Sequence, residues 1–126
     1  MDWGYPLNRY ARQMILPEVG TKGQAAVAGA RVLVVGAGGL AAPALPVLAG
    51  AGVGHLTLMD ADIVDVTNLH RQTLFGEEDC GQPKAEAAAR RLSALNGEIT
   101  MEARTEALTP ANAEALVAGA DLLLDC

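Results

Sequence analysis

The sequence predicts an α/β fold in which a mainly parallel sheet carries helices on both of its faces. An apolar run at residues 32–35 has the length of a short buried strand and leads directly into a glycine-rich turn at residues 36–39. A segment rich in Ala and Leu follows, and a second apolar run at residues 55–59 ends in Asp60. This order of strand, glycine turn, helix, strand and acid is that of a βαβ unit in a doubly wound sheet.

Residues 1–30 are predicted to form a helical segment ahead of the sheet, and residues 31–126 to form the sheet domain itself. The first segment carries polar and charged side chains ahead of the sheet: Arg9, Arg12, Gln13, Glu18 and Lys22. One short helix is expected to begin near Asn8 and to end before Pro17, because the residue that precedes a proline disfavours helical backbone. A second helix is expected at residues 22–29.

The first crossover helix is predicted at residues 40–51, where two prolines interrupt the sequence. Pro43 suits the first helical turn because its missing N–H costs little there, whereas Pro46 predicts either a kink or a late start of the helix. A polar stretch without clear periodicity follows Asp60. A loop of this length in a compact domain is unusual unless it binds something.

The second half of the chain continues the alternation of helix and strand. Residues 84–95 are good helix formers, with Pro83 before them and Asn96 and Gly97 after them to end the helix. Three further elements are expected: a strand at 99–104, a helix capped by Thr109 and begun by Pro110 that runs to 118, and a strand at 121–125. Right-handed crossovers turn this order into a parallel sheet. Because the chain stops after its fourth strand, we expect the sheet to be truncated there.

The composition and charge exclude several classes of function. The 126 residues carry a formal net charge of −6, whereas nucleic acids and anionic membranes attract a basic face, so neither is expected as a partner. No apolar run is long enough to span a bilayer and the N-terminus lacks a secretory signal, which predicts a cytoplasmic location. Cys80 and Cys126 lie in unrelated contexts and are expected to be reduced thiols, and no metal site is predicted within the chain.

The glycine turn has the residue types that bind a nucleotide. Gly36 would let the chain turn sharply off the strand, and Gly38 would remove a Cβ where phosphate oxygens approach the backbone. Ala41 stands at the position where the pattern requires a small residue for packing of the helix on the strand. Asp60 is placed to accept hydrogen bonds from ribose hydroxyls. Glycines also mark ordinary strand-to-helix turns, so a purely structural turn is the alternative.

Four polar residues after the second strand could act on a nucleotide: Asn68, Arg71, Gln72 and Lys84. Arginine and lysine are what a triphosphate requires, because its charge must be neutralised while the reacting phosphorus is oriented. Taken singly, each of the four is more often a solvated residue on a surface loop. Gln72 is interpreted only as a possible neighbour of the site.

Seven blocks of the sequence carry a family resemblance. They are RYARQ at 9–13, GAGGL at 36–40, AGVG at 51–54, LMDAD at 58–62, TNLHRQTLF at 67–75, GQPKAE at 81–86 and LLLDC at 122–126. In their order and spacing they resemble the ThiF/MoeB/HesA group of the ubiquitin-activating-enzyme-like superfamily. The resemblance covers residues 9–126 and implies a Rossmann-like fold for them.

The resemblance implies ATP-dependent adenylation of the C-terminal Gly-Gly carboxylate of a small ubiquitin-fold sulfur carrier, similar to MoaD or ThiS, for molybdopterin- or thiamine-type sulfur transfer. The carboxylate would attack the α-phosphorus of Mg²⁺-bound ATP and release pyrophosphate. It also implies that a magnesium-binding aspartate, most of the carrier-docking surface and a possible Zn²⁺ site follow Cys126. The chain is therefore expected to hold the ATP-binding half.

The resemblance also implies roles for single residues. Gly36, Gly38 and Gly39 would lie against the nucleotide and Asp60 against its ribose. Asn68, Arg71 and Lys84 match the family's triphosphate-binding residues, and Arg12 matches an arginine that reaches across a homodimer to the ATP of the partner. The catalytic roles fall to Arg12, Arg71 and Lys84. Ala41 replaces a glycine that is common in the family, which predicts tighter packing with binding retained.

Two other functions stay open at this point. The glycines and Asp60 alone would also suit a Rossmann oxidoreductase that uses NAD or FAD, although this leaves the RQ and QPK blocks without a role. The exposed last strand, which ends at Cys126, would suit an inactive copy that binds nucleotide or only dimerises.

Overall fold

A computed structural model describes residues 9–126 of the protein, so the expected helix start near Asn8 lies outside the described residues. The strands of the described part are β1 (Arg31–Val35), β2 (His55–Met59), β3 (Thr100–Arg104) and β4 (Leu122–Asp125). The helices are α1 (Ala11–Met14), α2 (Gly20–Gly29), α3 (Ala41–Ala51), α4 (Lys84–Leu95) and α5 (Pro110–Ala118). Two 3-10 turns, Val66–Asn68 and Glu77–Asp79, lie in the loop between β2 and α4.

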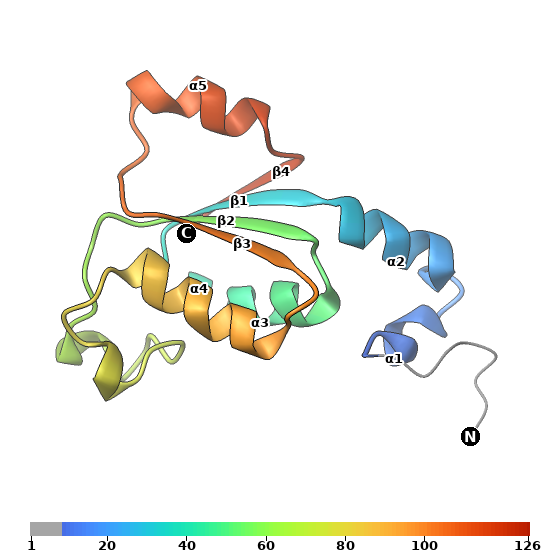
Figure 1. The fold of residues 1–126 in the computed structure, drawn as a ribbon, viewed down its shortest axis with the longest axis horizontal. Coiled ribbons are helices and arrows are strands. Elements are labelled where there is room, and N and C mark those ends of the chain that lie inside the picture. The colour runs from blue at the N-terminus through green and yellow to red at the C-terminus, as the bar shows by residue number, and fades with distance from the viewer. Residues whose placement is uncertain (1–8) are drawn as a thin grey trace.

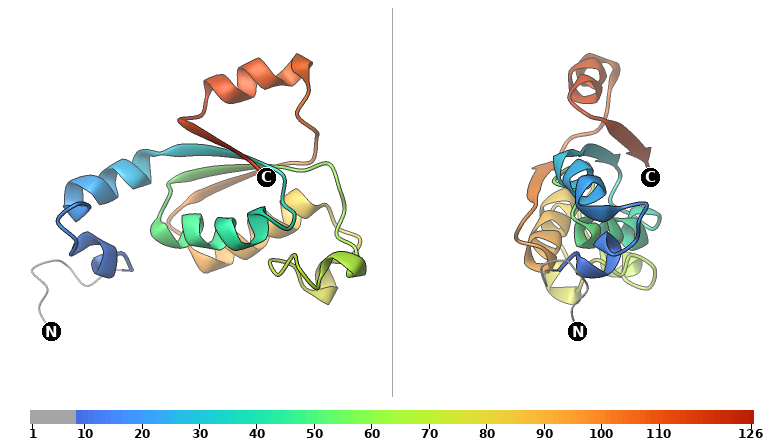
Figure 2. Two further views of the ribbon diagram at one scale, coloured as in Figure 1. Left: turned by 180° about the vertical axis from the view of Figure 1, so that it is seen from behind. Right: turned by 90° about the vertical axis from the view of Figure 1, so that its right-hand side faces the viewer.

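All strands of the sheet are parallel and lie in the order β3-β2-β1-β4 (Figure 1). Helices α3 and α4 cover one face of the sheet, and α5 crosses the opposite face (Figure 2). The predicted doubly wound α/β fold is therefore confirmed. Because the strands are parallel, the segments that follow β1, β2 and β3 all leave the sheet at the same end, where open α/β sheets bind their ligands.

The main hydrophobic core lies between the sheet and helices α3 and α4. Strands β1 and β2 contribute alternate side chains to it, Val32 and Val34 from the first and Leu56 and Leu58 from the second. The helices contribute mostly small residues, which lets them approach the sheet closely: Ala41, Ala42, Leu45, Ala49, Ala87, Ala88 and Leu92 are buried there. Ala41 is fully buried, as its place in the glycine pattern requires.

The opposite face of the sheet is more polar and more open. At matching positions on β1, β2 and β3 it presents Leu33, Thr57 and Glu102. None of the nine residues of α5 (Pro110–Ala118) is buried, and a cavity of about 160 Å³ lies between this helix and the sheet. The predicted site residues are absent from the lining of this cavity.

From α2 onward the predicted boundaries agree with the structure to within two residues. Helix α5 begins at Pro110 behind a capping box, in which Asn112 Oδ1 accepts a hydrogen bond from Thr109 N–H at 2.8 Å. The late start considered for the first crossover helix is wrong, because α3 begins at Ala41 and contains Pro46. Among residues 9–126 no helix has the length and apolar character needed to cross a membrane.

Candidate functional site

The glycine turn between β1 and α3 has a backbone that other residues do not readily follow. Gly36 has a φ of +101°, and a Cβ there would lie 2.9 Å from a backbone carbon just after β4. The loop between β2 and α4 lies against the rest of the turn. A Cβ on Gly38 would be 3.4 Å from Gln72 Nε2, and one on Gly39 would be 4.0 Å from the Arg71 side chain. The turn therefore contacts the segment that carries the predicted binding residues.

Asp60 joins the glycine turn to the same loop. Its Oδ2 accepts a hydrogen bond from Ala37 N–H at 2.8 Å, and its Oδ1 accepts one from Asp62 N–H at 2.8 Å. Each carboxylate oxygen can accept a further hydrogen bond, so a ligand hydroxyl can still bind to Asp60. Gly36, Asp60 and Asp62 line a cavity of about 260 Å³ whose outer wall comes from residues 106–108. This cavity lies at the carboxyl ends of β1 and β2.

Arg71 and Gln72 contact the turn in different environments. Arg71 is exposed, and its Nη1 donates to the Thr67 carbonyl at 3.3 Å. Within residues 9–126 it forms no ion pair with a carboxylate. Gln72 is only 4% exposed, and its Oε1 has no hydrogen-bond partner in the described part of the chain. A ligand that brings a donor to this oxygen would therefore be stabilised.

Lys84 begins α4 and is held beside the end of β2. The chain after β2 runs antiparallel to the chain before α4: Lys84 N–H donates to Asp62 O at 3.0 Å, and Val64 N–H donates to Gln82 O at 2.8 Å. Lys84 is only 6% exposed, and no carboxylate of the described residues forms an ion pair with it. Buried lysines are normally paired, so an anion bound here would supply the missing partner.

Asp79 fastens the loop between β2 and α4 to the side of α4. Its side chain is 8% exposed, and its Oδ2 accepts hydrogen bonds from Gly76 N–H at 2.8 Å and from Arg91 Nη2 at 3.2 Å. Arg91 also pairs with Glu78 at 2.7 Å. The loop therefore follows a fixed path, which sets the places of the residues that it carries.

Asn68 takes part in a turn within this loop. Its Oδ1 accepts a hydrogen bond from Asp65 N–H at 3.1 Å. Asp65 Oδ1 in turn accepts hydrogen bonds from the hydroxyl of Thr67 at 2.6 Å and from its N–H at 2.9 Å. These bonds stabilise the charged carboxylate, the hydroxyl more than the N–H, and they hold the pKa of Asp65 below its ordinary value of 3.8.

Replacement of Thr67 with valine is expected to raise the pKa of Asp65 toward 3.8, because valine lacks the hydroxyl that contributes most to the lowered value. Folding lowers the pKa of Asp65, so the charged carboxylate stabilises the folded protein at pH values above 3.8. This stabilisation is lost as the pH falls through the folded-state pKa. An NMR titration of the Asp65 carboxyl carbon in both proteins measures the shift. An unchanged pKa in Thr67→Val would contradict the assignment of the hydroxyl as the main cause.

Arg12 lies far from the glycine turn of its own chain. Helix α1 contacts the C-terminal end of α3, where Gln13 Nε2 donates to Ala51 O at 2.7 Å. Gly39 lies just before the N-terminal end of the same helix, and a helix of 11 residues is about 16 Å long. Figure 1 shows α1 and the loop between β2 and α4 at opposite ends of the sheet.

The structure thus brings the glycine turn and Asp60 to the same end of the sheet as Arg71 and Lys84. Asn68 lies in the loop that carries Arg71. Arg12 lies at the other end of the sheet within one chain. Sequence reasoning left Gln72 as a neighbour and did not single out Asp79. The only feature of the sequence that indicated Gln72 was its position directly after Arg71. The role of Asp79 depends on a contact with α4 that only the folded loop creates.

Two relatives of this chain are named as adenylyltransferases. The chain is 50% identical over 119 residues to a sulfur carrier protein adenylyltransferase of Thermus thermophilus, covering 94% of this chain and 44% of that protein. It is 47% identical over 129 residues to the adenylyltransferase and sulfurtransferase uba4 of Pyricularia oryzae, covering 98% of this chain and 26% of that protein. The chain therefore spans less than half of the length of each of these two relatives.

Solved structures share the fold. The tRNA N6-threonylcarbamoyladenosine dehydratase of E. coli, in complex with ATP, matches with a TM-score of 0.85 and 34% identity over 94% of this chain and 48% of that one. MccB of E. coli with ATP matches with a TM-score of 0.80 and 31% identity over 94% of this chain and 36% of that one. The model of the ThiF family matches residues 10–126, and the chain belongs to this family.

Proposed function

We propose that the protein carrying this chain adenylates the C-terminal Gly-Gly carboxylate of a small ubiquitin-fold sulfur carrier, with ATP as the source of AMP. One observation carries the proposal: Lys84 and Arg71, two cations without acidic partners among residues 9–126, lie with the glycine turn at the carboxyl ends of parallel strands. A triphosphate satisfies such a set of groups. The 50% identity to a sulfur carrier adenylyltransferase supports the choice of the carrier as second substrate.

Each of these groups would have its own part in the reaction. The backbone of the glycine turn and the first turn of α3 would hold the phosphates, and Asp60 would accept hydrogen bonds from the ribose. A carboxylate oxygen of the carrier forms a bond to the α-phosphorus, and the bond to the bridging oxygen breaks, so pyrophosphate leaves with the electron pair. Lys84 and Arg71 would stabilise the negative charge that accumulates on the leaving group.

Magnesium would enter with ATP and neutralise part of the phosphate charge. Within residues 9–126 no group of three or more His, Cys, Asp or Glu side chains is arranged to hold a metal ion, so we assign no protein ligand to it. The proposal places the reaction in the cytoplasm, where exposed thiols such as Cys80 stay reduced.

The proposal includes a homodimer in which Arg12 acts on the nucleotide of the partner. Helix α1 lies far from the glycine turn of its own chain, which supports this role. At that distance Arg12 would contact a nucleotide bound to the second copy and not the one bound to its own chain. A guanidinium is suited to the task because its planar fork binds two phosphate oxygens at once. Mixed dimers of Arg12→Ala and Lys84→Met chains test it: one site of each dimer would hold both residues, so activity absent from either homodimer should return.

ATP–pyrophosphate exchange tests the proposed activity. The full-length protein is expected to catalyse exchange that depends on a sulfur carrier with a Gly-Gly terminus and that is lost when the final glycine of the carrier is removed. Exchange that proceeds equally with and without the carrier would contradict the choice of the carrier as substrate. Binding of NAD in place of ATP would favour an oxidoreductase, and ATP binding without exchange would favour an inactive nucleotide-binding protein.

A further inference from the structure

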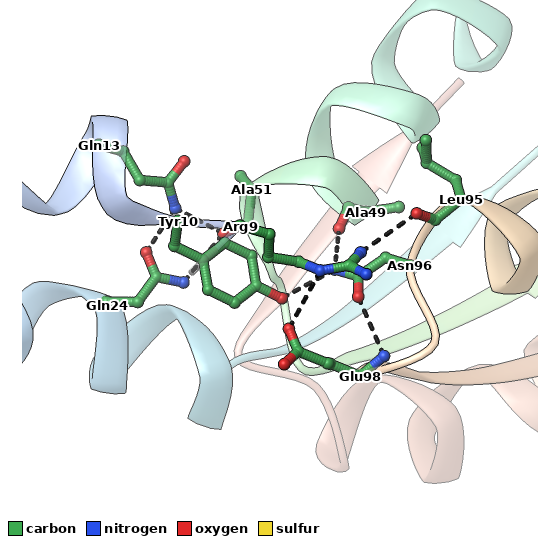
Figure 3. A network of polar contacts seen from close by, with 9 residues as sticks. All are labelled: Arg9, Tyr10, Gln13, Gln24, Ala49, Ala51, Leu95, Asn96 and Glu98. Carbon is green, nitrogen blue, oxygen red and sulfur yellow. Dashed lines mark hydrogen bonds and ion pairs between the residues drawn. The ribbon is translucent and has the colours of Figure 1, made fainter. Parts of the chain in front are cut away.

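Helix α1 is joined to the ends of α3 and α4 by a partly buried polar network (Figure 3). Its centre is Asn96, which is fully buried and directly follows α4. Asn96 Nδ2 donates to Tyr10 Oη and to the Ala49 carbonyl, both at 2.8 Å. Asn96 Oδ1 accepts a hydrogen bond from Glu98 N–H at 3.0 Å. A buried amide that uses both donors and its acceptor in this way holds its neighbours in one geometry.

A second part of the network closes the C-terminal end of α3. Gln13 Nε2 and Gln24 Nε2 both donate to the Ala51 carbonyl, at 2.7 and 3.1 Å, and the two glutamine amides are hydrogen-bonded to each other. The last carbonyls of a helix have no partner within the helix, so α1 and α2 supply partners that α3 lacks. We call Tyr10, Gln13, Gln24 and Asn96 the α1 anchor.

The ring of Tyr10 occupies a place that only a glycine leaves open. Gly52 has a φ of +91°, and a Cβ there would lie 2.7 Å from the Tyr10 ring. Helix α1 has four residues, a length that does not form a stable helix on its own. The place of α1 on the protein is therefore set by contacts with other elements, those of the α1 anchor among them, rather than by hydrogen bonds within the helix.

An exposed arginine, Arg12, lies in the short segment that the α1 anchor holds. In the sequence Arg12 lies between two anchor residues, Tyr10 and Gln13, which contact the end of α3 opposite to the glycine turn. We propose that the anchor is a positioning device that holds Arg12 for the nucleotide site of a second copy of the chain. Tyr10 and Asn96 are then positioning residues for a reaction that takes place in the partner. This inference rests on the role in trans given to Arg12 in the proposed function.

Release of α1 should lower activity even though the site itself is intact. A catalytic group must be well placed, and a displacement of about 1 Å can lower a rate about 100-fold. The double variant Tyr10→Ala, Gln13→Ala, the anchor variant, removes the hydrogen bonds that these two side chains make to Asn96, Gln24 and the Ala51 carbonyl. Gln24 and Asn96 keep their hydrogen bonds to α3 in this variant, so the C-terminal end of α3 stays capped.

Mixed dimers of the full-length protein test the proposal. Homodimers of the anchor variant are expected to lose about 10- to 100-fold in carrier-dependent exchange. Mixed dimers with Lys84→Met chains, purified through two different tags, are expected to regain about half of the wild-type rate, because one site of each dimer has Lys84 and receives a correctly anchored Arg12. Mixed dimers with Arg12→Ala chains are expected to stay as inactive as the homodimers. Lys22→Ala, an exposed change on α2, is the control and should match wild type.

Two outcomes would overturn the proposal. Rescue of the anchor variant by Arg12→Ala but not by Lys84→Met chains would place the defect in the variant's own site, and full activity of its homodimers would remove any positioning role. If circular dichroism shows the double variant unfolded, Tyr10→Phe is put through the same dimers. It keeps the ring but removes the hydroxyl that Asn96 binds, so the same pattern is expected with a loss of about 3- to 10-fold.

The proposed function fails separately from this inference. Absence of exchange in the wild-type protein would reject the adenylation activity. Absence of rescue between Arg12→Ala and Lys84→Met chains, in a wild-type protein that does catalyse exchange, would reject the role of Arg12 in trans. The anchor-variant dimers report on positioning once the wild-type protein catalyses exchange and the Arg12→Ala and Lys84→Met chains rescue each other.

Discussion

Replacement of Lys84 with methionine is expected to lower carrier-dependent ATP–pyrophosphate exchange by about 100- to 1,000-fold, the loss typical of removing one preorganised group that stabilises transition-state charge. Lys84 is 6% exposed and has no acidic partner in the described part of the chain, so its ammonium group would meet the phosphates in a poorly hydrated place. Methionine has a similar length without the charge. The assay is the exchange rate at saturating ATP and carrier.

The same substitution should not destabilise the fold. It removes a buried charge without a partner, so the midpoint of thermal unfolding is expected to stay the same or to rise. The matched control, Lys22→Ala on the exposed surface of α2, should leave both exchange and unfolding unchanged. A Lys84→Met protein that unfolds at the wild-type temperature and retains more than about a third of the exchange rate would exclude Lys84 from the reaction.

Gly54→Ala is expected to destabilise the protein by about 3 kcal/mol or more, because it forces an overlap in a packed region. A Cβ on Gly54 would lie 1.6 Å from the Ala28 carbonyl oxygen, and Gly54 N–H donates to the Val27 carbonyl at 3.1 Å. The chain before β2 therefore passes directly against the end of α2, and neither backbone can move without breaking this contact. Urea unfolding followed by circular dichroism measures the change.

Gly50→Ala is the matched control for that substitution. Gly50 lies within α3, and a Cβ there would have no atom within 4 Å. Alanine in a helix interior is favoured over glycine, so this variant should be more stable than wild type by about 0.5 to 1 kcal/mol. If the two alanine substitutions change the free energy of unfolding equally, the close approach between Gly54 and Ala28 does not exist in solution.

The sequence predicted those parts of the fold that local patterns determine. The apolar runs of β1 and β2, the glycine turn and the alternation of helix and strand each follow from neighbouring residues, so the doubly wound fold was predictable. The effect of Pro46 was not, because the helix continues through it once α3 is packed on the sheet. Strand order depends on contacts between distant segments and appeared only in the structure.

The residues of the candidate site could be singled out from the sequence, but their surroundings in the fold could not. Residue types and their order indicated Asp60, Arg71 and Lys84, yet the burial of Lys84 depends on the way the loop folds back on itself. The α1 anchor was not predictable at all. Asn96 was interpreted only as the end of a helix, and its bond to Tyr10 joins residues 86 positions apart in the sequence.

Transfer of a radioactive label from ATP to the carrier tests the central claim most directly. With the label on the α-phosphorus, carrier with an intact Gly-Gly terminus should become labelled when full-length protein is present, and about 100- to 1,000-fold more slowly with the Lys84→Met protein. With the label on the γ-phosphorus, all of the label should appear in pyrophosphate. Label on the carrier from the γ-phosphorus, or none from the α-phosphorus, would contradict adenylation.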